Sequence, residues 1–336
     1  MTLSTFLRGA TIAFILLPMA AFGEPIKLKL AYFTSDRARI YTVAIQPFIE
    51  AVNADEQGGL IIESYPGGVL GKDPALQAQL VRDGTADIAF VVLGTVPDQF
   101  KDHAVIELPG LFRDMREATW VNTRLVASGL MRGYEDFFVI AAAANFPLMV
   151  HSRPPIGSLS DLHGKILRVN NLIEGGALKA IGITPVIMPI NEVALAIGRG
   201  TIDGATMPAN ALFAYGVSRI TRFHYAAPLG AAPLAFLMNR KKLESLPTAA
   251  QDVIRKYSGE WTAARFVETY DANNIQAMND LKSDANRQVI MPPRAELDTL
   301  QATFQTVLEK WRNDSPRNLE LRKLVEAEIA KLRAGD

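Results

Sequence analysis

The chain contains no cysteine, and this absence excludes several kinds of site. Without thiols there is no disulfide, no thiolate nucleophile and no zinc-thiolate centre, so the fold depends on its apolar core. The 35 basic and 35 acidic residues cancel, which leaves no overall charge to attract nucleic acid or an anionic membrane surface. Apolar residues make up 49% of the 336 positions, enough for a sizeable core in a chain of this length.

Long uncharged apolar runs are also lacking, apart from one at the N-terminus. This run extends from Ala10 to Phe22, follows Arg8, and ends in a small-x-small pattern at residues 21–23. About 13 residues are too few to cross a bilayer, which takes roughly 20, whereas the ending is typical of a signal peptidase site. We therefore predict a signal peptide over residues 1–23 and export to the periplasm. The remaining length suits two domains at roughly 150 residues each.

Most catalytic signatures are missing as well. The segment 67–73 only loosely resembles a phosphate-binding loop, because Pro66 and Asp73 stand where a glycine and a hydroxyl residue are needed. No G-x-S-x-G elbow occurs, and the carboxylates are scattered rather than paired in apolar surroundings. None of the four histidines is spaced from another as metal ligands are: His103, His151, His163 and His224. We predict no catalytic residue, no metal and no cofactor.

A short repeat connects the two halves of the chain. The sequence G-T-A-D-I-A at residues 84–89 returns as G-T-I-D-G-A at residues 200–205. Each copy closes a strand, helix, strand pattern that starts at residues 60–65 in the first half and at residues 184–188 in the second. A unit built twice predicts two similar lobes, and the cleft between two lobes is a usual place for a small ligand.

Strand and helix patterns alternate along the rest of the chain. Alternating apolar residues from Ile26 to Tyr32 predict an opening strand, and the order of elements predicts a parallel sheet. A proline-rich break at residues 147–155 predicts the first crossover between lobes, and an apolar strand at residues 233–238 returns to the first lobe. Helical periodicity continues from residue 248 to 284, and an apolar stripe from Leu321 to Leu332 predicts a closing helix.

Seven segments in order resemble motifs of one protein family. They are Y-P-G-G-V-L-G at 65–71, L-V-R-D-G-T-A-D-I-A at 80–89, E-L-P-G-L-F-R-D at 107–114, D-L-H-G-K-I-L-R-V at 161–169, M-P-I-N-E-V at 188–193, G-T-I-D-G at 200–204 and L-E-S-L-P at 243–247. The chain resembles the solute-binding proteins of TRAP transporters, the DctP-type periplasmic receptors, over nearly its whole mature length.

The resemblance implies an α/β fold like that of type II periplasmic binding proteins, with hinge-connecting strands and a long helix spanning both lobes. Lobe I is predicted at residues 24–146 plus about 234–272, and lobe II at 147–233 plus about 273–336. The resemblance also implies a non-enzymatic receptor that captures an organic carboxylate and hands it to the small and large subunits of a TRAP permease, with no nucleic acid as partner. The alternatives are a periplasmic enzyme or a ligand sensor on the same fold.

Three site residues follow from the resemblance. Arg168 stands in the G-K-x-x-R-V motif whose arginine binds the ligand carboxylate in this family. A guanidinium suits this task, because its planar fork of donors grips a carboxylate through two parallel hydrogen bonds. Asn171 matches a position that adds a hydrogen bond, and Ile190 matches one that packs against the ligand.

Three departures from the family pattern shape the predicted pocket. Pro147, Met207 and Val92 stand where family members have polar ligand contacts. We therefore predict one carboxylate anchor in apolar surroundings, suited to a monocarboxylate with an aromatic or apolar body. Further predicted ligand contacts are Thr34, Ser35, Asn210 and Phe213, with Asn145 as a second polar substitute. Aromatic residues predicted near the cleft edges are Tyr32, Phe33, Phe90, Phe213, Tyr215 and Phe236.

Overall fold

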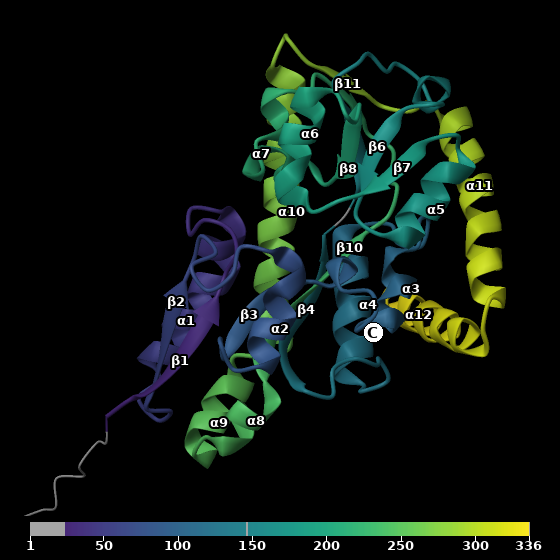
Figure 1. Cartoon of the computed structure of the whole chain (residues 1–336). Coiled ribbons are helices and arrows are strands. Elements are labelled where there is room, and N and C mark those ends of the chain that lie inside the picture. Colours follow the sequence, from purple (N-terminus) through teal and green to yellow (C-terminus); the bar gives the residue numbers. More distant parts are fainter. Residues whose placement is uncertain (1–23, 146, 336) are drawn as a thin grey trace, which may run out of the picture.

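The computed structural model describes residues 24–145 and 147–335, so the predicted signal peptide lies outside the described residues. The described chain forms two α/β lobes, each built on one sheet (Figure 1). The predicted two-lobe α/β fold class is therefore confirmed. Within the described part of the chain, no helix combines the length and apolar character needed to cross a membrane.

Lobe I is built on a five-stranded sheet in the order β2-β1-β3-β10-β4. Its strands are β1 (Ile26–Ala31), β2 (Leu60–Tyr65), β3 (Ile88–Val92), β4 (Phe137–Asn145) and β10 (Ala232–Asn239). The first three are parallel, and β10 runs antiparallel to β3 and β4. In β1, Leu28 and Leu30 are buried and Lys27 and Lys29 exposed, as the alternation predicts. Its helices are α1 (Gln46–Ala54), α2 (Gln77–Arg82), α3 (Ala104–Glu107), α4 (Met115–Ala127), α8 (Arg240–Ser245) and α9 (Thr248–Lys256).

Lobe II is built on a six-stranded sheet in the order β11-β9-β5-β8-β6-β7. Its strands are β5 (Met149–Ser152), β6 (Ile166–Val169), β7 (Thr184–Ile187), β8 (Gly204–Met207), β9 (Phe223–Tyr225) and β11 (Gln288–Ile290). Its shorter helices are α5 (Leu172–Ala180), α6 (Val193–Arg199) and α7 (Ala209–Ala214).

The two lobes repeat one topological unit. The order β2-β1-β3 in lobe I matches β7-β6-β8 in lobe II, and an antiparallel strand follows in each sheet. The repeated aspartates make equivalent bonds: Asp87 Oδ2 accepts from the amide of Lys29 at 2.7 Å, and Asp203 Oδ2 accepts from the amide of Ile166 at 2.8 Å. Both carboxylates thus hold an incoming strand to its neighbouring strand, which explains why the motif recurs.

A long helix spans the two lobes, as predicted. Helix α10 (Glu260–Ser283) places Phe266 and Tyr270 in the apolar core of lobe I, and Ala277 and Leu281 in a core cluster of lobe II (Figure 1). Because one rigid element enters both cores, it limits how the lobes can move against each other.

The C-terminal helices correct one predicted boundary. Helix α11 (Arg294–Asn313) packs Leu300 and Phe304 into lobe II, whereas α12 (Pro316–Ala334) packs its stripe of Leu321 and Val325 into lobe I (Figure 1). The predicted apolar stripe is present, but the assignment of residues 273–336 to lobe II is wrong for α12. The chain turns between α11 and α12 so that α12 runs toward α3 and α4 of lobe I, and an apolar stripe alone does not specify which lobe it will cover (Figure 1).

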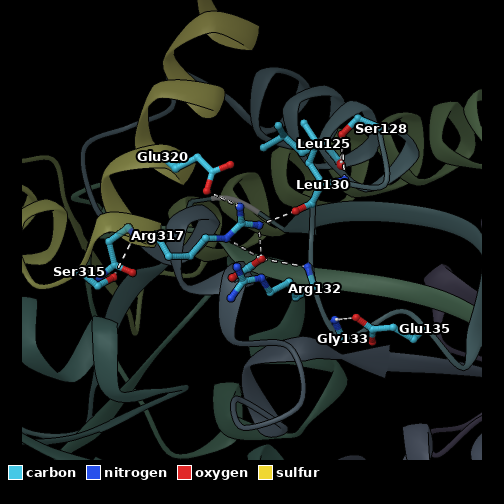
Figure 2. Close-up of polar contacts among 11 residues, drawn as sticks. Leu125, Ser128, Leu130, Arg132, Gly133, Glu135, Ser315, Arg317 and Glu320 are labelled. Atoms are coloured by element: carbon cyan, nitrogen blue, oxygen red, sulfur yellow. Dashed lines mark hydrogen bonds and ion pairs between the residues drawn. The ribbon is translucent and has the colours of Figure 1, made fainter.

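Arg317 attaches the start of α12 to lobe I (Figure 2). Its Nη2 donates to Asp102 Oδ2 at 2.5 Å and also to the carbonyl of Leu130, and its Nη1 donates to Glu320 Oε2 at 2.7 Å. Asp102 Oδ2 accepts a further bond from the amide of Arg132 at 2.9 Å. One nearly buried carboxylate therefore holds α12 and the segment after α4 together.

Candidate ligand site between the lobes

The predicted site lies where the two lobes meet at the carboxyl ends of their parallel strands, a usual ligand position in α/β sheets. Tyr215, just after α7, packs against the core of lobe I as well as a core cluster of lobe II. Ile173 of α5 likewise packs against the lobe I core. These contacts bring the end of β3 in lobe I close to the end of β6 in lobe II.

Arg168 on β6 is the predicted anchor, and only 2% of it is exposed. Its Nε donates to the carbonyl of Met188 at 3.0 Å, and its Nη1 donates to Asn170 Oδ1 at 2.7 Å and to the carbonyl of Thr206 at 3.4 Å. Its Nη2 makes no hydrogen bond to any described residue. Burial lowers the pKa of Arg168 to about 10, so the guanidinium stays charged at neutral pH. The site therefore offers a buried cation with one free donor nitrogen.

Glu174 on α5 supports this arginine through Asn170. Its Oε2 accepts from the Asn170 amide at 2.7 Å and from Asn170 Nδ2 at 2.8 Å, while Asn170 Oδ1 accepts from Arg168. Burial raises the pKa of the Glu174 carboxyl, and the bonds from Asn170 and the charge of Arg168 oppose that rise. The Arg168 side chain is thus held in one orientation by a polar chain that ends in a buried carboxyl group.

Asn171 caps the N-terminus of α5 and faces lobe I. Its Oδ1 accepts from the amide of Glu174 at 2.8 Å, as an N-cap residue does. Its Nδ2 is buried without a partner in the described structure and lies 3.4 Å from where a Cβ on Gly94 would stand. The capping bond leaves Nδ2 free, so the predicted ligand bond would use that nitrogen and stays a prediction.

A cluster of aromatic side chains in lobe I, here called the aromatic wall, lies next to Tyr215 of lobe II. Phe90 stacks on Phe33 with ring centroids 6.3 Å apart and on Phe266 at 6.0 Å. Tyr32 meets Phe90 edge to face at 6.0 Å, and Tyr270 stacks on Phe266 at 6.1 Å. The wall combines strand ends of lobe I with the long helix α10. Neither Phe266 nor Tyr270 could be predicted from the sequence to lie near the site, because their helical spacing is typical of any buried helix face.

Tyr215 faces the wall from lobe II. Burial raises its pKa, and the nearby Arg168 charge opposes the rise. Phe213 is exposed on α7, and its contact with a ligand stays a prediction, whereas Phe236 is buried within β10 against Phe48. The prediction that Phe236 lies near the cleft edge is therefore wrong, because its side chain points into the lobe I core.

Five other predicted ligand contacts occupy the strand ends and crossovers. Val92 ends β3 and is half-buried, as are Pro147 in the first crossover and Ile190 after β7. Thr34 is half-buried and its carbonyl accepts from the amide of Gly67 at 2.6 Å. Ser35 is exposed. Their contact with a ligand stays a prediction.

Met207 is the last residue of β8, and Asn210 lies in the first turn of α7. The Met207 side chain is fully buried in a lobe II core cluster. Asn210 Oδ1 accepts from Asn145 Nδ2 at 3.2 Å, and its amide donates to Asn274 Oδ1 at 3.1 Å. Because Asn274 Nδ2 also donates to Asn145 Oδ1 at 3.3 Å, three asparagines link the first crossover, lobe II and the long helix. Ligand contacts of Met207 and Asn210 stay predictions.

Folding buries two pairs of polar residues, and the second pair shows that the interpretation of the carboxylates as unpaired in apolar surroundings is wrong. His151 and His224 are buried together with their Nδ1 atoms 2.8 Å apart, because β5 and β9 pair in antiparallel register. Glu107 on α3 and Glu174 on α5 are both buried, and the charge of Glu174 adds to the burial that raises the pKa of Glu107 well above its ordinary value. The two histidines are 73 positions apart in the sequence and the two glutamates are 67 positions apart, so no local spacing could indicate either pair.

The arrangement suits binding of an anion with a flat apolar body. A charged guanidinium with a free donor can hold a carboxylate, and the aromatic wall can hold the attached body. Among the described residues, no group of three or more His, Cys, Asp or Glu side chains is arranged to hold a metal ion.

Comparisons with known proteins identify the family of the chain. The family model described as bacterial extracellular solute-binding protein, family 7 (DctP), matches residues 30–314. A solute-binding protein of Verminephrobacter eiseniae is 26% identical over 62% of this chain, and the match spans 63% of that protein. The C4-dicarboxylate-binding periplasmic protein DctP of Rhodobacter capsulatus is 24% identical over 86% of this chain and 88% of that protein.

A solved structure is similar over almost the whole described chain. It is a marine metagenome TRAP solute-binding protein specific for aromatic acid ligands, in complex with 3-hydroxybenzoate. It has a TM-score of 0.85 and 26% identity, and the match covers 92% of this chain and 99% of that one. The family match over most of the chain and the shared two-lobe architecture lead to one identification: the chain belongs to bacterial extracellular solute-binding protein family 7, and it is a TRAP solute-binding receptor rather than an enzyme.

Proposed function

We propose that this receptor captures an aromatic or similarly apolar monocarboxylate between its lobes in the periplasm and delivers it to the membrane subunits of a TRAP permease. The observation that carries the proposal is the position of Arg168, a buried cation with a free Nη2, near an aromatic wall. The similar metagenome receptor, which is specific for aromatic acids, supports the same class of ligand.

The charges at the site favour one carboxylate over two. Arg168 is the single cation among the site residues described above, and the neighbouring ionisable groups are the carboxyls of Glu174 and Glu107. A second ligand carboxylate would lose its water next to acids and aromatic rings, and a buried charge without a partner is costly. A dicarboxylate is therefore a poorer complement to this site.

Selectivity tests the proposal. We expect benzoate and 3-hydroxybenzoate to bind more tightly than succinate by about tenfold or more, measured by calorimetry. Phe33→Leu should weaken benzoate binding about threefold to tenfold, because it removes an aromatic contact. Phe138→Leu, at the start of β4, is the matched control and should change affinity little. If succinate binds at least tenfold more tightly than benzoate, the proposed ligand class is wrong.

Capture requires the lobes to close, and the chain offers a hinge. The crossovers between β4 and β5 and between β9 and β10 are bonded to each other, because the amide of Leu148 donates to the carbonyl of Gly230 at 3.0 Å and the amide of Leu229 donates to the carbonyl of Leu148 at 2.9 Å. Paired short crossovers allow backbone rotation without disturbing either core. Small-angle scattering should show a smaller radius of gyration with saturating benzoate than without it. Identical profiles, with binding shown independently, would exclude closure.

A further inference from the structure

We propose that closing the lobes on a ligand takes up one proton at Glu107, so that ligand affinity falls as the pH rises. This inference rests on the proposed function, because it assumes that ligand binding closes the lobes. It concerns a residue that does not need to touch the ligand.

Glu107 ends α3 in lobe I and is 5% exposed. Its neighbours Val105 and Ile106 are fully buried in the lobe I core. Its carboxyl group accepts no hydrogen bond from any described residue, and Oε1 lies 2.6 Å from where a Cβ on Gly94 would stand. A nearly buried carboxyl group without a donor is unusual, since such groups are normally paired.

The groups opposite Glu107 come from lobe II. Asn171 Nδ2 lies 3.4 Å from the same Cβ position on Gly94 and has no partner in the described structure. The Glu174 carboxyl, one turn along α5, is also buried. Ile173, between them, packs against the lobe I core. The Glu107 carboxyl of lobe I and the unpartnered Nδ2 of Asn171 in lobe II therefore lie together beside Gly94 at the boundary between the lobes. The burial of Glu107 thus depends on the lobes being together.

No cation compensates Glu107. The positive charge of Arg168 lies near Glu174 instead, because Asn170 is hydrogen-bonded to both side chains. Of the elements packed against α3, strand β10 has no ionisable residue, the turn before α3 contains Lys101, Asp102 and His103, and α5 contains Glu174 and Lys179. The charged residues of α12 are Arg317, which is bound to Asp102, and Glu320, Arg322, Lys323, Glu326, Glu328, Lys331 and Arg333. None of these cations is among the groups that shift the pKa of Glu107. Burial raises the pKa of Glu107 well above its ordinary value, and the charge of Glu174 adds to this rise. With the lobes together, as in this structure, burial and the Glu174 charge therefore favour the neutral acid form of Glu107.

Opening of the lobes should lower the pKa of Glu107 again. When lobe II moves away, water reaches Glu107 and the Glu174 charge recedes, so the carboxyl returns toward the ordinary pKa of about 4.3 and ionises at neutral pH. The pKa is higher in the closed form, so protonation favours closure. The contribution of Glu107 protonation to the stability of the closed form is complete below the open-state pKa of Glu107. It is lost as the pH rises toward the closed-state pKa of the same group. The dissociation constant should rise by up to about tenfold per pH unit within that window.

The first test uses the unmodified protein. Calorimetry of benzoate binding near pH 7, in buffers with different ionisation enthalpies, should show uptake of about one proton per ligand. Benzoate stays ionised across the range, and burial lowers the pKa of His103 to about 3 and of His224 to about 4, so these two histidines stay neutral. Binding without proton uptake overturns the inference but leaves the proposed function intact, whereas absence of any carboxylate binding contradicts the proposed function itself.

The second test uses Glu107→Gln, which imitates the neutral acid. The variant should bind benzoate with little pH dependence between about pH 5.5 and about pH 8.5, and more tightly than the unmodified protein at the upper end. Glu56→Gln, at an exposed site in lobe I, is the matched control and should keep the original pH dependence. A Glu107→Gln variant that keeps the full pH dependence would overturn the inference.

Discussion

Replacing Arg168 by alanine should weaken benzoate binding by roughly 2 to 5 kcal/mol, which is a loss of at least about thirtyfold. The carboxylate would lose its water on entering the site without finding a charged partner. The measurement is calorimetry on protein shown to be folded by circular dichroism. A folded Arg168→Ala variant that binds within about threefold of the unmodified protein would exclude Arg168 as the anchor.

Arg168→Lys is the matched variant, because it keeps the charge and loses the fork of donors. It should recover only part of the affinity, since an ammonium cannot make two parallel bonds to a carboxylate.

Removing Arg168 should also lower the free energy of unfolding by about 1 to 3 kcal/mol, because the carbonyls of Met188 and Thr206 lose their buried donor. Affinity must therefore be compared at temperatures where each variant is folded.

Replacing Arg317 by alanine should lower the free energy of unfolding by about 2 to 4 kcal/mol, because it leaves Asp102 nearly buried without its cation. The Arg317 side chain is itself only 18% exposed. Denaturant unfolding measures the change.

Arg294→Ala is the control for this effect. Arg294 pairs with Asp298 on the same helix at 2.9 Å, but its side chain is 84% exposed. An exposed pair of this kind contributes less than about 1 kcal/mol. Equal losses for Arg317→Ala and Arg294→Ala would show that the Arg317 contacts do not stabilise the attachment of α12 to lobe I.

Local patterns in the sequence determined the elements and their duplication. The alternation from Leu28 to Leu30 predicts β1, and the repeated G-T-x-D motif predicts two equivalent units, because both features depend on neighbours along the chain. The same holds for the apolar stripe of α12, which the helical period of its residues reveals. The motif around Arg168 likewise identified a position whose burial and free nitrogen suit an anchor.

Tertiary structure alone decided which distant groups meet. Glu107 faces Glu174 only because α3 and the start of α5 approach across the boundary between the lobes. His151 meets His224 through strand pairing, and α12 covers lobe I after the chain turns away from α11. The pKa values of these groups depend on burial and on charges brought near by folding, and neither quantity is a property of local sequence. The sequence by itself therefore determined the receptor architecture and the position of the proposed anchor, whereas folding determined the environment that decides whether Glu107 holds a proton.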